Sequence, residues 1–599
     1  MRLLILLHIG SLQADEQCVN SDGVARCDAD CNNALLKCQT DCGDDFNCVS
    51  ACNRELVKCK DSCPCRAVDC LNGCPCANIY CSTFIVDIDG FGTVKGQEDE
   101  VHNEVVKFLG VPYAEVPQRF AASVMKKSLG EEIFDATRFG DGCIGSTLAN
   151  WRSEDCLNVN VYLPKSYLLD PTQKLPVLIN IHGGGFLTGS NRDGNLQPEQ
   201  LVHENEMIVV QVNYRLAHFG FWYSGELDSN GNDGNWGLLD QQLALKWVSK
   251  YISSFNGDPE QVTITGCSAG GQSVILHTLL EDSWPLFKRA IAYSGPIGVP
   301  FYTREEAERI YTKVAKCLQC KSAGDLECLR GKTATQLADC TWSLRAIGTE
   351  DGPANISLRN RKVTQLAEMY GPVIGSKLLA GDINALIKSG QVKPNVELII
   401  NFASDEGEDF IESIFYPLGS ESGVIPDRVN RVPRQTIERI FRFLYDKGDN
   451  TTVISDQLIN EYSQCIENGA SRENDECGDE AARWITDYMW ACIGRDALNN
   501  YQESANIYYI EHSTPWPLEM TINPNGNRRQ CHEKSCHCVS EYWLFGRYHR
   551  NDKISDDKEL QYGVNFRRQN ANFIKYGTKP DGLKLGIIST LLKKIRKIL

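Results

Sequence analysis

Apolar runs that alternate with amphipathic stretches predict a parallel sheet in the middle of the chain. Short continuous apolar runs, typical of buried strands, occur at residues 177–181, 207–214, 261–266 and 289–295. Between them, residues 237–253 carry apolar side chains at helical spacing. Strands that alternate with helices are typical of α/β proteins, in which helices cover a mostly parallel sheet. We therefore expect an α/β fold with a central sheet flanked by helices.

A different pattern fills the N-terminal part of the chain, where cysteine is the recurring residue. The chain has 27 cysteines, and 14 of them lie between Cys18 and Cys81. Residues 27–42 repeat as 48–63 with cysteines at identical offsets. On a helix these offsets fall within about 60° of one face. Two antiparallel helices would then be joined by four disulfides: Cys27–Cys63, Cys31–Cys59, Cys38–Cys52 and Cys42–Cys48.

This Cys-rich module, residues 18–81, is too small to fold on an apolar core alone. A zinc site is the alternative use of its cysteines, and disulfides are favoured because such cysteine density suits an oxidising compartment. The module would serve either as a stabilising spacer or as a docking module for a partner. Pairing among its remaining cysteines stays open, and these are Cys18, Cys65, Cys70, Cys74, Cys76 and Cys81.

Both ends of the chain carry segments outside the expected α/β domain, which spans residues 83–580. Residues 1–14 combine an early arginine, an apolar run and small residues, which predicts a secretory signal and an extracellular protein. Sequons at Asn355 and Asn450 are compatible with glycosylation. Residues 583–599 could form a basic amphipathic helix for a membrane surface or a protein partner, or a packed terminal helix. The net charge of −17 argues against a nucleic-acid partner.

The segment Gly266-Cys267-Ser268-Ala269-Gly270 joins a predicted strand to a predicted helix. A serine on such a tight turn has a strained backbone, and glycines on either side avoid clashes. The helix that follows directs its N-terminus at the site, which favours developing negative charge. This context predicts Ser268 as a nucleophile.

The glycine run from Gly183 to Gly185 follows another predicted strand. Backbone N–H groups can approach the oxyanion of a tetrahedral intermediate closely where side chains are absent. We assign Gly184 and Gly185 as oxyanion donors, together with the N–H of Ala269. A purely structural glycine turn is the alternative.

A serine nucleophile needs a base, and the base needs an orienting acid. Where this serine motif occurs, the three follow in the order serine, acid, histidine. Spacing alone does not choose among the histidines that follow the serine, which are His277, His512, His532, His537 and His549. The first of these lies in the helix directly after the nucleophile and would point elsewhere.

From about Ile85 to Lys579 the chain resembles the type-B carboxylesterase and cholinesterase family of α/β-hydrolases. The resemblance rests on ordered matches at residues 108–120, 154–164, 234–248, 255–271 and 568–580. It implies an α/β-hydrolase fold behind the Cys-rich helical hairpin. It also implies a serine esterase that requires no metal or cofactor.

The resemblance selects the partners of the serine. The family's acid motif is matched by Ser-Asp-Glu-Gly at 404–407, which implies Glu406 as the acid, with neighbouring Asp405 as its rival. The family's histidine segment is matched at 537–546, which implies His537 as the base, with His532 as its rival. Ser294 resembles the family's serine that supports the acid.

Two disulfides can be transferred from the family. The resemblance implies Cys143–Cys156 as the first bridge and Cys317–Cys328 as the second, with Cys320 as a rival partner in the second.

Three positions depart from the family pattern. Cys267 stands before the nucleophile, where many members have glutamate, and Cys538 follows the histidine, where glycine is usual. Trp151 is the only tryptophan between the cysteines of the first bridge, and it cannot be equated with the cation-binding tryptophan of cholinesterases. A quaternary ammonium needs such an aromatic face, so a choline ester is less expected than a small or lipid carboxylic ester.

The resemblance thus implies a secreted carboxylic-ester hydrolase that forms an acyl-enzyme. The alternative is an adhesion or structural protein of the same fold that has lost activity and uses its Cys-rich module for interaction. The presence of Ser268, Glu406 and His537 argues against that alternative. The oligomeric state stays open.

Overall fold

The computed structural model describes residues 83–577, with gaps at residues 146–148, 170–172, 194–195, 197, 230–233, 344–369, 412–413, 415–431, 433, 446–451, 463–476, 493, 495–505, 513–534 and 547–556. The signal at 1–14, the Cys-rich module at 18–81, both sequons and the tail at 583–599 lie outside the described residues. They stay predictions.

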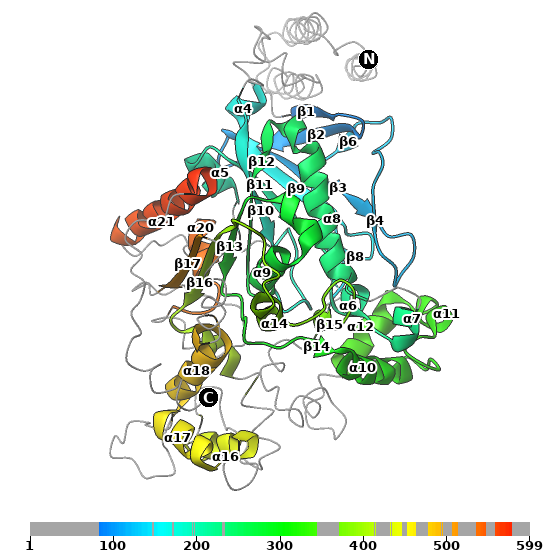
Figure 1. The fold of residues 1–599 in the computed structure, drawn as a ribbon. Helices are drawn as coiled ribbons and strands as arrows, with labels where there is room; N and C mark the ends of the chain where they lie inside the picture. The colour runs from blue at the N-terminus through cyan, green and yellow to red at the C-terminus, as the bar shows by residue number, and fades with distance from the viewer. Residues whose placement is uncertain are drawn as a thin grey trace, which may run out of the picture.

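One large mixed sheet forms the centre of the described chain (Figure 1). Its strands follow the order β1-β2-β3-β9-β11-β10-β12-β13-β16-β17, and β6 pairs with β2. From β11 to β17 in this order the strands are parallel, whereas β1, β2, β3 and β9 are joined by antiparallel pairs. The strands are β1 (Thr83–Ile88), β2 (Gly92–Glu98), β3 (Val105–Pro112), β6 (Phe134–Asp135), β9 (Asn158–Pro164), β10 (Leu175–Ile181), β11 (Ile208–Val212), β12 (Gly257–Cys267), β13 (Arg289–Tyr293), β16 (Glu397–Ala403) and β17 (Asn506–His512).

The four predicted strands coincide with β10, β11, β12 and β13, and the predicted helix at 237–253 is α8 (Trp236–Tyr251). In β10, Val177, Ile179 and Ile181 belong to the core under α8 and α9, whereas Leu178 belongs to the core on the opposite face. Burial on both faces explains why this strand is a continuous apolar run. The α/β prediction is confirmed.

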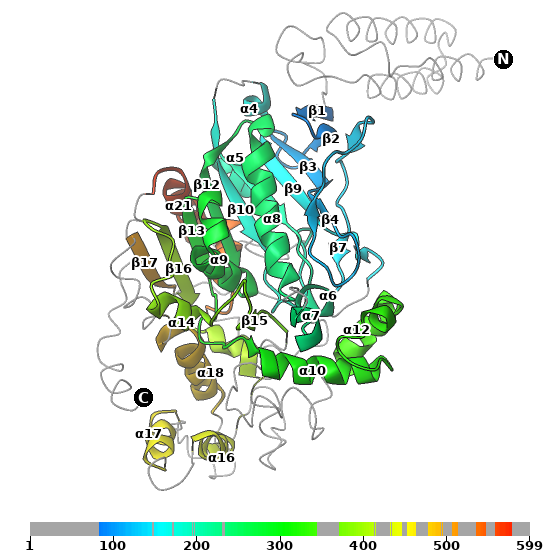
Figure 2. The same ribbon diagram turned by 45° about the vertical axis from the view of Figure 1, so that its right-hand side comes forward.

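Helices cover both faces of the sheet, as Figure 2 shows. One face carries α8 and α9 (Ala269–Leu279), and α9 packs on β12 and β13. The other face carries α5 (Pro198–Glu204), α20 (Val539–Leu544) and α21 (Asp557–Tyr576), which contacts β10 and β12.

Two outer groups of helices lie beyond the lower end of the sheet in the views of Figures 1 and 2. One group has its own apolar core and consists of α16 (Arg434–Tyr445), α17 (Thr452–Tyr462), α18 (Gly478–Thr486) and the π-helix η6 (Asp487–Ala491). The other consists of α6 (Ala217–Phe221), α7 (Gly225–Ser229), α10 (Arg304–Cys317), α11 (Leu326–Arg330) and α12 (Ala334–Ser343).

Short elements complete the described chain. The strands are β4 (Ala114–Glu115), β5 (Val124–Met125), β7 (Gly142–Cys143), β8 (Arg152–Ser153), β14 (Tyr302–Thr303) and β15 (Val373–Ile374). The helices are α4 (Lys165–Leu169), η2 (Ile252–Phe255), η3 (Glu281–Leu286), α14 (Ile383–Lys388) and η5 (Glu406–Phe410). Within the described ranges, no helix has both the length and the apolar character that crossing a membrane requires.

One of the two transferred disulfides is present and the other is wrong. Cys143 and Cys156 are bonded, as the resemblance implied. The predicted Cys317–Cys328 bridge is replaced by two bridges, Cys317–Cys340 and Cys320–Cys328. Cys317 ends α10, which packs on α12, so its sulfur meets the cysteine of that helix. The rival Cys320 lies past the end of α10 and takes the partner on α11.

Candidate active site

Ser268 lies on the turn between β12 and α9, at the carboxyl end of a central strand. Its backbone has φ 60° and ψ −127°, a conformation that non-glycine residues rarely adopt. A Cβ on Gly266 would lie 2.3 Å from the carbonyl oxygen of Ile181, and one on Gly270 would lie 2.1 Å from the same atom. The two glycines are therefore required for the turn to pack against β10, as the sequence predicted.

The glycine run that follows β10 lies directly against this turn. A Cβ on Gly183 would be 2.6 Å from the carbonyl oxygen of Cys267 and 3.1 Å from the Cβ of Ser268. Gly184 and Gly185 have φ of 102° and 60°, and both are half-buried. Ala269 is the first residue of α9. The predicted oxyanion donors thus belong to two segments that meet at the serine turn.

Glu406 and His537 are in direct contact, although 131 residues separate them. The Oε2 atom of Glu406 is 2.5 Å from Nδ1 of His537, and its Oε1 accepts the N–H of Ala403 at 2.7 Å. The Glu406 side chain has no exposed surface, and that of His537 is 12% exposed. A buried carboxylate that accepts the Nδ1 proton leaves Nε2 of the imidazole as the basic nitrogen. This burial is inconsistent with a solvated loop carboxylate.

The rivals of these two residues have other roles where the structure describes them. Asp405 accepts hydrogen bonds from the hydroxyl of Ser404 and the backbone N–H of Ser535, at 2.6 and 3.1 Å. His277 is buried inside α9, where its ring nitrogens contact Ser283 and Gln241. The histidines at 532 and 549 lie outside the described residues, as does the side chain at 512.

Aromatic rings flank the imidazole of His537. Its centroid lies 4.9 Å from the ring of Phe410 and 5.5 Å from that of Trp490. The indole N–H of Trp490 donates to the carbonyl oxygen of Ser294 at 2.8 Å. Sequence reasoning missed both aromatic residues, because they come from helices whose packing no local motif encodes.

Ser294 contacts the segment of the base, whereas the resemblance implied support of the acid. Its Oγ accepts the backbone N–H of Cys538 at 3.2 Å, and its own N–H donates to the carbonyl of Asn401 at 2.6 Å. The serine follows β13, so its position beside the neighbouring β16 is fixed by the parallel pairing of these strands.

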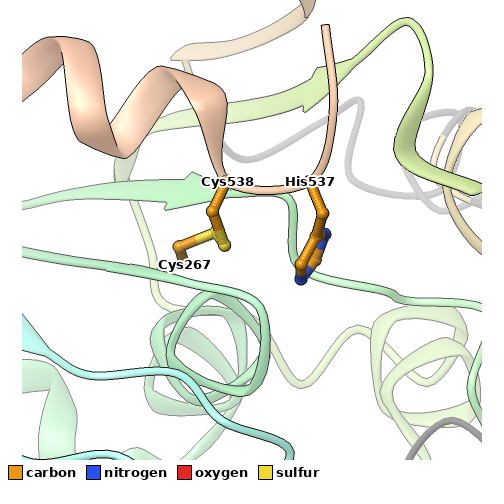
Figure 3. A group of neighbouring side chains, drawn as sticks. All are labelled: Cys267, His537 and Cys538. Carbon is orange, nitrogen blue, oxygen red and sulfur yellow. A yellow bond between two sulfur atoms is a disulfide. The ribbon is translucent and has the colours of Figure 1, made fainter. Parts of the chain in front are cut away.

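The two cysteines that depart from the family pattern are bonded to each other (Figure 3). Cys267 and Cys538 form a disulfide with a Cα–Cα distance of 5.7 Å across 271 residues of sequence. Sequence reasoning singled out both residues and missed the bond. Because Ser268 and His537 are assigned to one site, the residues next to them in sequence must also be close in space. That reasoning would have predicted the bond between Cys267 and Cys538.

A second buried carboxyl group lies near the imidazole. Glu541 is on α20, and its Oε1 accepts a hydrogen bond from the amide of Asn180 at 2.9 Å. Burial raises the pKa of Glu541 to about 7, although Asn180, His537 and the backbone of Cys267 each act to lower it. This group was not foreseen, because nothing in the sequence around it indicates that it is buried.

Among the described residues, Cys267, His537 and Cys538 form a group whose potential metal-ligand atoms lie within 4.8 Å of one another. Cysteine binds metals as the thiolate. Because the two sulfurs are bonded to each other, they offer no thiolate, and the group as it stands does not fit a metal ion.

Known proteins resemble this chain in both sequence and fold. The family model that matches it, over residues 82–590, is described as the carboxylesterase family. The chain is 35% identical over 345 residues to an acetylcholinesterase of Danio rerio, in a match that covers 53% of this chain and 51% of that protein. It is 33% identical over 328 residues to a para-nitrobenzyl esterase of Bacillus subtilis (strain 168), with 53% and 62% covered. These matches therefore span about half to two thirds of the relatives' own length.

The fold comparison covers more of the molecule. A solved structure of a PNB esterase, an α/β-hydrolase, aligns with a TM-score of 0.62 at 26% identity and covers 82% of this chain and 91% of that one. The central sheet, the strand-to-helix serine turn and a family match that takes in most of the sequence agree with one another. The chain therefore belongs to the carboxylesterase family.

Proposed function

We propose that this protein is a secreted serine carboxylic-ester hydrolase with Ser268 as nucleophile, His537 as general base and Glu406 as the orienting acid. The observation that carries the proposal is the buried contact between Glu406 and Nδ1 of His537, on a segment bonded to the residue before Ser268. The family supports ester hydrolysis as the reaction.

The reaction follows from the protonation states that this contact favours. His537 takes the proton of the Ser268 hydroxyl through Nε2 while the serine oxygen attacks the ester carbonyl. The alcohol leaves with the proton from His537, which creates an acyl-enzyme. Water, activated by the same imidazole, then releases the acid and regenerates the serine. Glu406 stabilises the imidazolium and holds the ring in the productive tautomer.

The tetrahedral intermediates place negative charge on the former carbonyl oxygen. In this proposal the N–H groups of Gly184, Gly185 and Ala269 receive that charge. The left-handed glycines support this role because they carry no side chain, and the N-terminus of α9 supports it because the first N–H groups of a helix have no partner within the helix. Loss of one such donor raises the barrier by about 3 kcal/mol.

Small-molecule or lipid carboxylic esters are the proposed substrates, with choline esters disfavoured. Trp151, the only tryptophan of the first disulfide loop, already has two cations on its ring. The guanidinium groups of Arg152 and Arg192 lie 4.4 and 5.0 Å from its centroid. A quaternary ammonium would have to compete with both groups for this aromatic face.

Secretion is supported by the described disulfides. Cys143–Cys156, Cys267–Cys538, Cys317–Cys340 and Cys320–Cys328 would not persist in a reducing cytosol. Together with the predicted signal at 1–14, they favour an oxidising compartment.

An ester panel tests the proposed function on the full chain. p-Nitrophenyl acetate, butyrate and decanoate are compared with acetylthiocholine, for the wild type and Ser268→Ala. We expect hydrolysis of at least one p-nitrophenyl ester to exceed that of acetylthiocholine, and kcat to fall at least 10³-fold in Ser268→Ala. Folded wild type without Ser268-dependent hydrolysis would contradict the proposal and favour the interaction-protein alternative.

A further inference from the structure

The Cys267–Cys538 disulfide joins the two segments that carry the proposed nucleophile and base. Cys267 is the last residue of β12 and directly precedes Ser268. Cys538 directly follows His537 and is the residue before α20. Figure 3 shows the imidazole of His537 beside the bonded sulfurs. The disulfide therefore joins the direct neighbours of two residues whose side chains must come into contact for the reaction to occur.

The backbone conformation of Cys538 indicates that a cysteine occurs at this position because it forms the disulfide. Its φ is 66°, in the left-handed region that glycine adopts without strain. A side chain is unfavourable in this conformation, and glycine is the residue that the family pattern places here. The cysteine side chain provides the disulfide to β12, which a glycine could not form.

Hydrogen bonds also hold the segment of the base. Glu406 fixes one nitrogen of the ring and therefore its tautomer. The hydrogen bond from the N–H of Cys538 to Ser294 is long, at 3.2 Å. The disulfide joins this segment covalently to the end of β12, and so it ties the position of the base to the turn of Ser268.

We propose that the Cys267–Cys538 disulfide is a positioning device for ester hydrolysis, which holds the His537 segment at a fixed distance from the Ser268 turn. This inference rests on the proposed function. Misplacing a catalytic group by about 1 Å can slow a reaction by about 100-fold. A bond one residue away from each reacting side chain restricts such displacements directly.

The partial exposure of Cys538 makes the bond open to chemical testing. Cys267 is 1% exposed, whereas Cys538 is only partly buried. A small dithiol such as dithiothreitol would attack at Cys538. It supplies two electrons and two protons, so that both cysteines become thiols and the dithiol closes into its own disulfide.

The first experiment compares full-length wild type with Cys267→Ala/Cys538→Gly and with a matched control, Cys320→Ala/Cys328→Ala. The control removes a bridge between the segment after α10 and α11, in another part of the fold. We expect the first variant to lower kcat for p-nitrophenyl butyrate at least 10-fold with KM changed less than twofold. The control should keep kcat within twofold. A folded first variant with wild-type kcat and pH profile would overturn the proposal.

Dithiothreitol applies the same test to folded wild type, and it can overturn the proposal even if the double variant does not fold. Wild type and the Cys320→Ala/Cys328→Ala control should lose at least 10-fold in kcat and regain it on reoxidation. The Cys267→Ala/Cys538→Gly variant should lose no further activity. An unchanged wild-type kcat after mass spectrometry shows both thiols would overturn the proposal, as would an equal fractional loss in the first variant.

Ser268→Ala separates this inference from the function on which it rests. If wild type hydrolyses the ester, Ser268→Ala does not and the disulfide variant matches wild type, the positioning role is wrong and the proposed function stands. If wild type shows no Ser268-dependent hydrolysis, both the positioning role and the proposed function are wrong.

Discussion

At the scale of single residues, the proposed chemistry depends on a strained serine and a buried carboxylate. The sequence predicted the serine from its flanking glycines, and the clash distances at Gly266 and Gly270 give the physical reason. Glu406 and His537 came from family resemblance, because no local pattern distinguishes a buried carboxylate from a solvated one. The bond between Cys267 and Cys538 escaped prediction since pairing depends on the folded distance.

Glu406→Gln should abolish most of the activity while leaving the fold intact. The glutamine has the same shape, but it cannot stabilise the imidazolium and its amide favours the wrong tautomer of His537. We expect kcat to fall about 10³- to 10⁴-fold, measured with a p-nitrophenyl ester. Asp405→Asn is the matched control, because Asp405 contacts Ser404 and Ser535, and its kcat should stay within about threefold of wild type. Equal losses in the two variants would contradict the assignment of the acid.

Glu541 should make stability depend on pH in a direction unusual for a carboxylate. Its folded pKa of about 7 lies above the ordinary value of 4.5, so the folded state holds the proton more tightly between pH 4.5 and 7. The group therefore favours folding at low pH, and this contribution is lost as pH rises through 7. The loss amounts to about 3 kcal/mol, since each unit of pKa corresponds to about 1.4 kcal/mol.

Glu541→Gln removes this titration. The free energy of unfolding of the variant, relative to wild type, should therefore rise by about 2.5 kcal/mol between pH 5 and pH 8, measured by urea unfolding. A difference between variant and wild type that does not change with pH would show that Glu541 does not titrate in this window.

At the scale of elements, the parallel strands and α8 were predictable because each is buried in a regular pattern. The outer antiparallel strands β1 and β2 were not, since exposed or half-exposed positions interrupt the buried ones along them. In β2, for example, Val94 and Gly96 are buried, and the other positions are half-exposed. The two disulfides near the end of α10 show the same limit, because the sequence does not show which neighbouring helix Cys317 and Cys320 each meet.

Gly270→Ala should disrupt the serine turn. The new Cβ would lie 2.1 Å from the carbonyl oxygen of Ile181, and a backbone atom within a central strand has little freedom to move. We expect kcat to fall at least 100-fold in the soluble variant. Gly331→Ala is the control, because its nearest contact would be 3.4 Å and its φ is −72°, and it should keep wild-type activity. Full activity of Gly270→Ala would contradict the described packing.

Asp240→Ala should strongly destabilise the packing of α8. Asp240 has no exposed surface, and it accepts two hydrogen bonds from the guanidinium of Arg215, at 2.7 and 2.8 Å. Removing the carboxylate leaves a buried guanidinium without its counter-charge, which costs about 3–5 kcal/mol in the free energy of unfolding. The exposed pair of Glu305 and Arg309 supplies the control, and Glu305→Ala should cost less than about 1 kcal/mol. Similar losses in the two variants, measured by urea unfolding, would be inconsistent with this account of Asp240.

At the scale of the whole molecule, the Cys267–Cys538 bond closes the longest loop among the described disulfides. Cross-linking residues 271 positions apart restricts the unfolded chain and can stabilise the fold by up to about 5 kcal/mol. The sheet, its flanking helices and the family could be predicted from the sequence. The outer helices around Trp490 were not, because they pack in an apolar core of their own that is assembled from segments far apart in the sequence.

Ser268 as the nucleophile is tested most directly by labelling with a fluorophosphonate, which forms a stable bond only with an activated serine. The labelled full-length protein is digested, and the modified peptide is identified by mass spectrometry. We expect a single adduct on Ser268 in wild type and none in Ser268→Ala. Folded wild type that takes up no label, or an adduct that persists in Ser268→Ala, would contradict the proposed site.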